Sequence, residues 1–144
     1  GIKEASGNIS QMAAILNAVP DEFNVLSGDD AITLPLIALG GRGVISVVSN
    51  EIPFEMAQMT RLARAGDFAA AREIHRRVHP LMEVNFVESN PMPVKAAMAQ
   101  MGLLEPVWRL PLVAPKAESE ARIHAVLETL ELVAPQHATA HAAA

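Results

Sequence analysis

The sequence of 144 residues lacks cysteine and tyrosine, and aromatic residues make up only 3% of it. Without cysteine there can be no disulfide framework, no thiolate nucleophile and no thiolate metal site, which suits a reducing cytosol. A core must therefore be built from Ala, Leu, Val, Ile and Met. Because 51% of the residues are hydrophobic, the chain can bury one modest globular core, and we expect a cytoplasmic protein.

Long apolar runs and basic clusters are missing as well. No run reaches the roughly 18 residues that a membrane-spanning helix needs, and no signal-peptide pattern opens the chain. Lys and Arg total 11 against 16 Asp and Glu, so the formal net charge is −5 at pH 7. Without a basic patch this balance disfavours nucleic acid as a partner. We expect neither a nucleic-acid nor a membrane partner.

Three short apolar segments predict β-strands, over residues 1–5, 23–27 and 43–48. None alternates polar and apolar residues, which is typical of parallel strands covered on both faces. Helical periodicity between them predicts helices over 11–18 and 31–39, with Asn8 or Ser10 capping the first and Asp29 or Asp30 the second. The resulting β-α-β-α-β order, with right-handed crossovers, predicts a parallel sheet with helices outside it.

The rest of the chain is predicted to be helical. Apolar periodicity and cap residues, such as Asp67 before a helix and Gly102 after one, place helices over 53–65, 68–84, 94–101 and 119–134. The Ala- and His-rich tail over 135–144 has no periodicity, and we expect it to be disordered.

A three-stranded parallel sheet makes a poor independent domain, because both of its edges carry unpaired backbone groups. Three βα units are three eighths of a (β/α)8 barrel. We therefore interpret the chain as α/β, the C-terminal portion of a TIM barrel with its sixth to eighth strands, followed by a C-terminal helical bundle. The predicted parts are barrel units over 1–66, a helical extension over 67–134 and the tail. The sequence begins with glycine inside a predicted strand, so we expect a piece of a longer protein.

Lys3, in the first predicted strand, is the candidate nucleophile. Burial disfavours the charged form of a lysine, and a neutral lysine can form a Schiff base with a carbonyl substrate. The alternative is that Lys3 pairs with a carboxylate or lies at a solvated strand end. In a barrel, active sites form at the carboxyl ends of the strands. Lys3 would then point towards the site, with Gly28, Asp29 and residues 49–50 at its mouth.

Five motifs carry a family resemblance, in this order: GIKEASGN at 1–8, SGDDAITLPLIALGG at 27–41, GVISVVSN at 43–50, VESNPMPVKAAM at 87–98 and RLPL at 109–112. Each is weak alone, but together they resemble the dihydrodipicolinate synthase family of class I pyruvate-dependent lyases and aldolases. The resemblance covers residues 1 to about 134. It implies a (β/α)8 barrel with a C-terminal helical bundle, usually assembled as a homotetramer.

The resemblance also implies a site and a reaction. Lys3 would form the Schiff base with pyruvate, and Gly28 and Ile45 would line the pyruvate pocket through backbone and shape. The enamine would attack aspartate semialdehyde, giving the cyclic precursor of diaminopimelate and lysine, without a metal or other cofactor. The family's threonine pair, tyrosines and arginine lie upstream of the lysine strand and are absent here. We therefore expect the isolated chain to be inactive without the missing N-terminal part.

Two other functions stay open. Sister aldolases of the family use the same imine on N-acetylneuraminate or on keto-deoxy sugar acids. Alternatively, the chain is an inactive fragment or an interaction module whose open sheet edges and apolar helices favour association.

Three further features have structural explanations that we favour. His75 and His79 lie four residues apart, but without a third ligand we expect a solvated surface pair instead of a metal site. Asp29 and Asp30 could be paired acid–base carboxylates, yet a helix cap is favoured. Residues 40–43 could cradle a phosphate, but they follow a helix instead of opening one, so we predict a tight turn.

Overall fold

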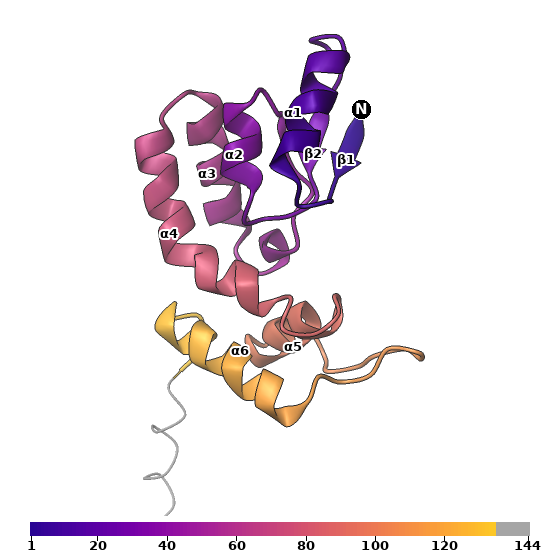
Figure 1. The fold of residues 1–144 in the computed structure, drawn as a ribbon. Coiled ribbons are helices and arrows are strands. Elements are labelled where there is room, and N and C mark those ends of the chain that lie inside the picture. Colours follow the sequence, from indigo (N-terminus) through magenta and orange to yellow (C-terminus); the bar gives the residue numbers. More distant parts are fainter. Residues whose placement is uncertain (135–144) are drawn as a thin grey trace, which may run out of the picture. The chain divides into compact units, whose positions relative to one another are not determined.

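The computed structural model describes residues 1–134 and divides the chain into two compact units, Gly1–Met82 and the residues from Glu83 onward (Figure 1). The predicted tail over 135–144 lies outside the described residues. The predicted boundary at residue 66, between barrel units and a helical extension, is a different kind of division and stays a prediction.

The first unit is built on a parallel sheet in which β2 is the central strand. The sheet has the order β1-β2-β3, with Lys3 of β1 opposite Leu26 of β2, and Leu26 opposite Gly43 of β3. Helices connect the strands, as predicted, in the order β1 (Ile2–Glu4), α1 (Ile9–Ala18), β2 (Val25–Ser27), α2 (Thr33–Ala38) and β3 (Gly43–Val44).

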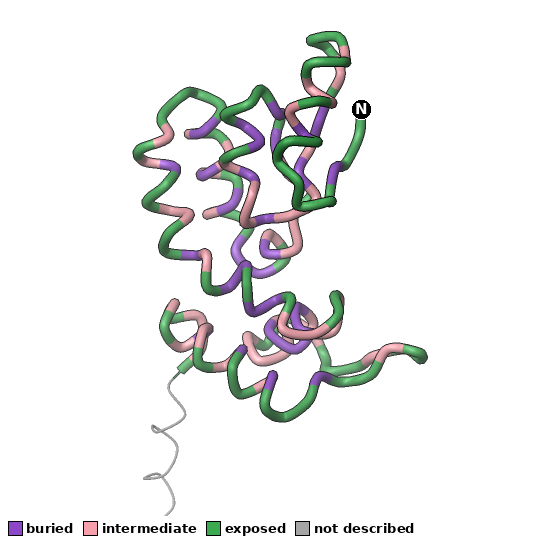
Figure 2. The backbone as a smooth tube through the Cα atoms, viewed as in Figure 1, coloured by how far each residue is buried: buried purple, intermediate pink, exposed green. Residues whose placement is uncertain are grey.

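Helices bury one face of this sheet. Met12 of α1, Val25 of β2 and Leu36 of α2 are fully buried and form one hydrophobic cluster. After β3 follow the short 3-10 helix η1 (Val48–Asn50), α3 (Pro53–Arg64) and α4 (Phe68–Val84). Figure 2 shows buried positions recurring along α2, α3 and α4, while the connection between α3 and α4 is exposed. This amphipathic pattern is what the apolar periodicity of the sequence predicts.

The third strand is shorter than predicted. Residues 43–48 were expected to be extended, but β3 ends at Val44 and the chain turns into η1 at Val48. The N–H groups of Val47 and Val48 donate to the buried carboxylate of Asp30, at 2.9 and 3.0 Å. These bonds draw the segment away from a strand path, so the predicted extension beyond Val44 is wrong.

Strand β1 also differs from the prediction. Its residues were expected to be buried, yet Ile2 and Lys3 are exposed and only Glu4 is buried. Glu4 accepts hydrogen bonds from the Ser6 N–H and the Gln11 side chain, at 3.2 and 2.9 Å, and so fixes the turn into α1. Since side chains alternate along a strand, Lys3 points to the face opposite Glu4.

The second unit contains α5 (Met92–Gln100) and α6 (Ala117–Thr129), which pack against each other. Buried Val94 and Ala97 on α5 and Ile123 and Leu127 on α6 supply apolar contact surface. Helix α5 begins at the NPMP motif and ends before Gly102, as predicted. Helix α6 was predicted over 119–134, but it begins two residues earlier and ends five residues earlier.

Both ends of α6 have a physical cause. At its start, the Glu88 carboxylate accepts the Lys116 N–H at 2.9 Å and serves as a cap from outside the helix. At its end, Glu131 adopts a left-handed φ of 58°, and the Leu132 N–H donates to the Leu127 carbonyl. This closure matches the end of α3, where Gly66 takes the left-handed position at φ 86°.

None of the helices formed by residues 1–134 is both long and apolar enough to cross a membrane.

Replacing Glu131 by glycine is expected to stabilise the second unit. A left-handed φ costs an L-residue roughly 1 kcal/mol that glycine does not lose. The Glu131→Gly variant should therefore raise the free energy of unfolding by about 1 kcal/mol in urea melts. Arg122→Gly, inside α6, is the matched control and should lower it by a similar amount. No stabilisation by Glu131→Gly would contradict the proposed helix closure.

Replacing Glu88 by glutamine is expected to destabilise the second unit in a pH-dependent way. The Ser119 side chain and then the Lys116 N–H hold the pKa of Glu88 below its ordinary value of 4.5. A lowered carboxyl pKa gives stability that is fully present above pH 4.5 and is lost as the pH falls through the lowered pKa. Glu88→Gln should melt at a lower temperature at pH 7, with the difference shrinking in acid.

The matched control for Glu88 is Glu118→Gln, which removes a charge from the first turn of α6 but keeps the bond to Lys116. It should lower the melting temperature less than Glu88→Gln at pH 7. A difference between wild type and Glu88→Gln that stays constant from pH 7 to pH 3 would rule out the charged cap.

Candidate functional site

The structure brings Lys3 and Gly28 into direct contact. A Cβ atom built on Gly28 would lie 2.8 Å from the Cε atom of Lys3 and 2.6 Å from the Cβ atom of Ala5. The Gly28 N–H donates to the Glu4 carbonyl at 2.7 Å, which holds the two segments together. A side chain at position 28 would clash with the Cβ atom of Ala5 and would also displace the lysine side chain, so the close approach favours glycine.

Ile45 lies on the other side of β2 from Lys3. Its N–H donates to the Ser27 carbonyl at 2.8 Å, directly before Gly28, and 48% of its surface is exposed. The three predicted site residues are therefore all fixed to β2 or to the residue that follows it. Lys3 is exposed in the described chain, so its ammonium group is open to reactants from the face opposite α1.

The loop after β2 is held by its own polar groups. The Ser27 hydroxyl donates to the Asp29 carbonyl at 2.6 Å, and the Thr33 hydroxyl donates to the same oxygen at 3.1 Å. The Asp29 carboxylate accepts the Ala31 N–H at 2.9 Å. These short-range bonds make residues 27–33 a closed turn, with Gly28 in its first part.

Asp30 has a different role from the one predicted. It was expected to cap α2 as an alternative to Asp29, but α2 has no side-chain cap bond at Ile32. Instead its Oδ2 atom accepts from Val47 and Val48, across 17 and 18 residues of sequence. Sequence reasoning missed this bridge because nothing in the SGDD motif specifies a partner so far along the chain.

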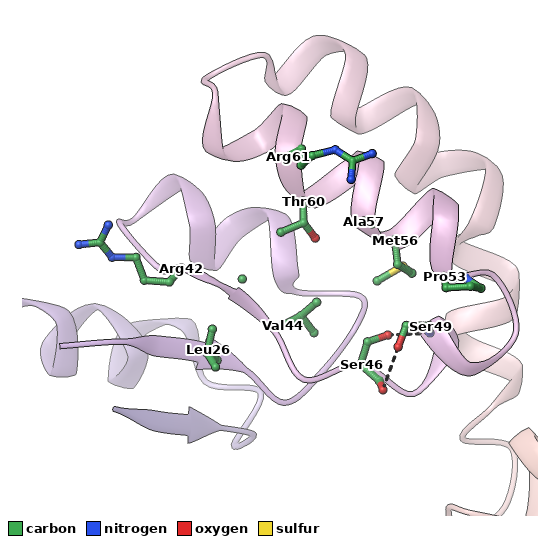
Figure 3. Close-up of a pocket in the computed structure, with 11 residues that line it drawn as sticks. Leu26, Arg42, Val44, Ser46, Ser49, Pro53, Met56, Ala57, Thr60 and Arg61 are labelled. Carbon is green, nitrogen blue, oxygen red and sulfur yellow. Dashed lines mark hydrogen bonds between the residues drawn. The ribbon is translucent and has the colours of Figure 1, made fainter. Parts of the chain in front are cut away.

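A cavity of about 370 Å³ lies beside Gly43 of β3 (Figure 3). Leu26 and Val44 of the sheet line it on one side, and Met56 and Thr60 of α3 on the other. The missing side chain of Gly43 opens this space, since Thr60 and Leu26 are the nearest groups to a Cβ built there. In the described chain β3 has a strand neighbour on one side only.

His75 and His79 of α4 do not form the solvated surface pair that was predicted. Both are half-buried, with ring centroids 5.2 Å apart. His75 Nε2 lies 2.9 Å from the Ala31 carbonyl oxygen, so this ring packs on the loop after β2. Across residues 1–134, no group of three or more His, Cys, Asp or Glu side chains could hold a metal ion.

Residues 40–43 form the tight turn that was predicted. Gly40 adopts a left-handed φ of 110°, and the Gly41 N–H donates to the Leu36 carbonyl at 2.9 Å. The turn closes the carboxyl end of α2 and leads straight into β3.

Comparison with known proteins identifies relatives across most of the chain. A curated 4-hydroxy-tetrahydrodipicolinate synthase from Pelodictyon phaeoclathratiforme is 48% identical over 132 residues, which are 92% of this chain and 45% of the relative. The crystal structure of dihydrodipicolinate synthase from Thermotoga maritima superposes with a TM-score of 0.89 at 40% identity, covering 92% of this chain and 46% of that one.

A second solved structure, of chloride-inhibited dihydrodipicolinate synthase from Acinetobacter baumannii complexed with pyruvate, gives a TM-score of 0.89 at 33% identity, with the same coverage of 92% and 46%. The chain thus has the fold of part of these enzymes, and it spans less than half the length of the relatives it matches. The model of the dihydrodipicolinate synthetase family matches residues 1–130. The chain therefore belongs to the dihydrodipicolinate synthetase family.

Proposed function

We propose that this chain is the C-terminal part of a 4-hydroxy-tetrahydrodipicolinate synthase and that it supplies the Schiff-base lysine. The contact between Lys3 and Gly28 carries the proposal, because it sets a primary amine against an open stretch of backbone where a small keto acid can approach. Membership of the family and the names of relatives 46–48% identical support the same reaction.

In this proposal the Lys3 amine adds to the keto carbon of pyruvate, and water leaves as the imine forms. Loss of a proton from the pyruvate methyl group gives the enamine, with the imine nitrogen taking up the electron pair. The methylene carbon then attacks the aldehyde of aspartate semialdehyde. Attack by that substrate's own amino group on the imine carbon closes the ring and releases Lys3. Gly28 and Ile45 would hold the pyruvate through backbone and shape.

The complete site needs an upstream part. The chain covers 45% of the Pelodictyon relative, and β1 and β3, the outer strands of the described sheet, each have one strand neighbour. We propose that an upstream part adds strands to these edges, closes a (β/α)8 barrel and brings the groups that move protons. The cavity beside β3 gives space for added chain. We call this chain, joined to that part, the complete enzyme.

The isolated chain is proposed to be inactive or nearly so. Lys3 is exposed to water here, and one missing general acid or base typically costs 10²–10⁴-fold in rate. We further propose a homo-oligomeric complete enzyme, a tetramer as its family resemblance implies, with residues 67–134 acting as a helical extension. A cytoplasmic location stays a prediction.

The second substrate decides between this function and the sister aldolases. Turnover of the complete enzyme should be measured with pyruvate and aspartate semialdehyde, and in parallel with N-acetylneuraminate and keto-deoxy sugar acids. Preference for a sugar acid would replace the proposed function while leaving the imine chemistry intact. Failure of both, despite a folded protein, would favour the inactive fragment or interaction module.

Lys3 is expected to be the residue that pyruvate modifies. Borohydride reduction in the presence of labelled pyruvate should attach one label to each chain of the complete enzyme, located by peptide mass spectrometry on residues 1–8. Lys3→Ala should take up none, because the imine nitrogen is gone. Lys95→Ala is the matched control, since its ammonium group lies beside Trp108 in the second unit. Labelling that persists in Lys3→Ala would eliminate the assigned role.

Gly28→Ala is expected to slow imine formation in the complete enzyme. The added methyl group would displace the Lys3 side chain, and misplacing a reacting group by about 1 Å can cost about 10²-fold in rate. The rate of borohydride trapping measures the loss. Adding Ala5→Gly removes the nearer of the two clashing groups and should restore part of the rate. A Gly28→Ala variant with an unchanged trapping rate would show that the close approach has no role.

A further inference from the structure

The buried carboxylate of Asp30 links the two segments that carry Gly28 and Ile45. Asp30 is 1% exposed and follows Gly28 by two residues. Its Oδ2 atom accepts the N–H groups of Val47 and Val48, which follow Ile45 by two and three residues. One carboxylate oxygen therefore bridges the loop after β2 and the segment after β3, both beside the proposed pyruvate position.

Residues 45–48 have two attachments to the β2 segment. One is the backbone bond from Ile45 to the Ser27 carbonyl, and the other is the pair of bonds to Asp30. Ser46, which lies between them, turns its hydroxyl to the Ser49 N–H instead (Figure 3). Without Asp30 the segment would lose both of these bonds to the loop, and the Ile45 side chain could move relative to Gly28.

The loop that carries Asp30 is fixed well enough to act as an anchor. Ser27 and Thr33 both donate to the Asp29 carbonyl, and His75 lies against the Ala31 carbonyl. Because three contacts fix this loop, Asp30 can hold Val47 and Val48 in a fixed position. The two bonds that Asp30 accepts, at 2.9 and 3.0 Å, have the ordinary length of N–H···O hydrogen bonds.

The Oδ1 atom of Asp30 is buried and makes no hydrogen bond to the described residues. A buried oxygen atom without a hydrogen-bond partner destabilises the folded chain. The presence of a carboxylate at this position therefore needs a further reason. A carboxylate in place of a hydrophobic residue is explained by the two N–H groups that it holds, which an apolar side chain would leave unpaired.

We propose that Asp30 is a positioning residue for pyruvate, which acts by holding Ile45 at a fixed distance from Gly28 through Val47 and Val48. The inference rests on the proposed function, in which Gly28 and Ile45 line the pyruvate pocket. Asp30 does not touch the reacting atoms; it sets the width of the pocket that they enter.

The test compares substitutions of Asp30 in the complete enzyme. Asp30→Ala should raise KM for pyruvate about tenfold, within the range seen for residues that act on a site without touching the ligand, with KM for aspartate semialdehyde nearly unchanged. Asp30→Asn keeps an oxygen acceptor for both N–H groups and should stay within about threefold of the wild type. Amide hydrogen exchange at Val47 and Val48 should rise in Asp30→Ala and remain slow in Asp30→Asn.

Asp67→Ala is the matched control, because Asp67 also accepts a backbone N–H, that of Ala70, but at the start of α4. It should lower the melting temperature and leave KM for pyruvate unchanged. If Asp30→Ala does not fold, Val47→Pro removes one of the two donors while keeping the carboxylate, at a backbone φ of −85° that is close to the range of about −65 ± 15° that proline adopts. Val47→Pro should then raise KM for pyruvate.

An unchanged KM for pyruvate in a folded Asp30→Ala enzyme that still traps pyruvate would overturn the positioning role alone. So would equal effects on KM for both substrates, because a general loss of structure would then suffice. Absence of pyruvate-dependent trapping in the unsubstituted complete enzyme would overturn the proposed function, and the pyruvate role of Asp30 with it.

Discussion

Strand β2 is the constraint on which the rest of the site depends. Burial of Val25 against Met12 and Leu36 fixes the strand between its helices. The neighbouring residue Leu26 then pairs with both outer strands, which sets the register of Lys3 and of Gly43. Because side chains alternate along a strand, the burial of Val25 against the helices places the Leu26 side chain on the opposite face of the sheet. A slip of one residue would turn Lys3 towards the helices.

The sequence was most informative where local chemistry decides the structure. Continuous apolar segments located the strands, and Asn8 caps α1 as its residue type indicates. The turn at Gly40 and the helix starts at Pro53 and Met92 also follow from local backbone preferences. The resemblance carried by five motifs supplied the family, which the match over residues 1–130 confirms.

Sequence reasoning was less informative where a partner is distant in the chain. The bond between Glu88 and Lys116 sets the start of α6, and the bridge from Asp30 ends β3, yet neither pairing leaves a periodic signal. The burial of Lys3 was predicted from the apolar character of its own strand. Burial depends on what covers the strand, however, and the described chain covers only the face that Glu4 occupies.

The three residues of the proposed site are held in place by groups of this chain. Lys3, Gly28 and Ile45 are held in mutual register by backbone bonds between neighbouring segments and by the Asp30 carboxylate, while His75 of α4 lies against the loop after β2. The proposed nucleophile and the proposed pocket wall are thus positioned by this chain itself, whereas each outer strand of the described sheet has one strand neighbour. Catalysis requires groups that stabilise the transition state as well as groups that hold the substrate. In the proposed enzyme this chain does the holding, and the upstream part supplies the proton transfer, so neither part should be sufficient alone.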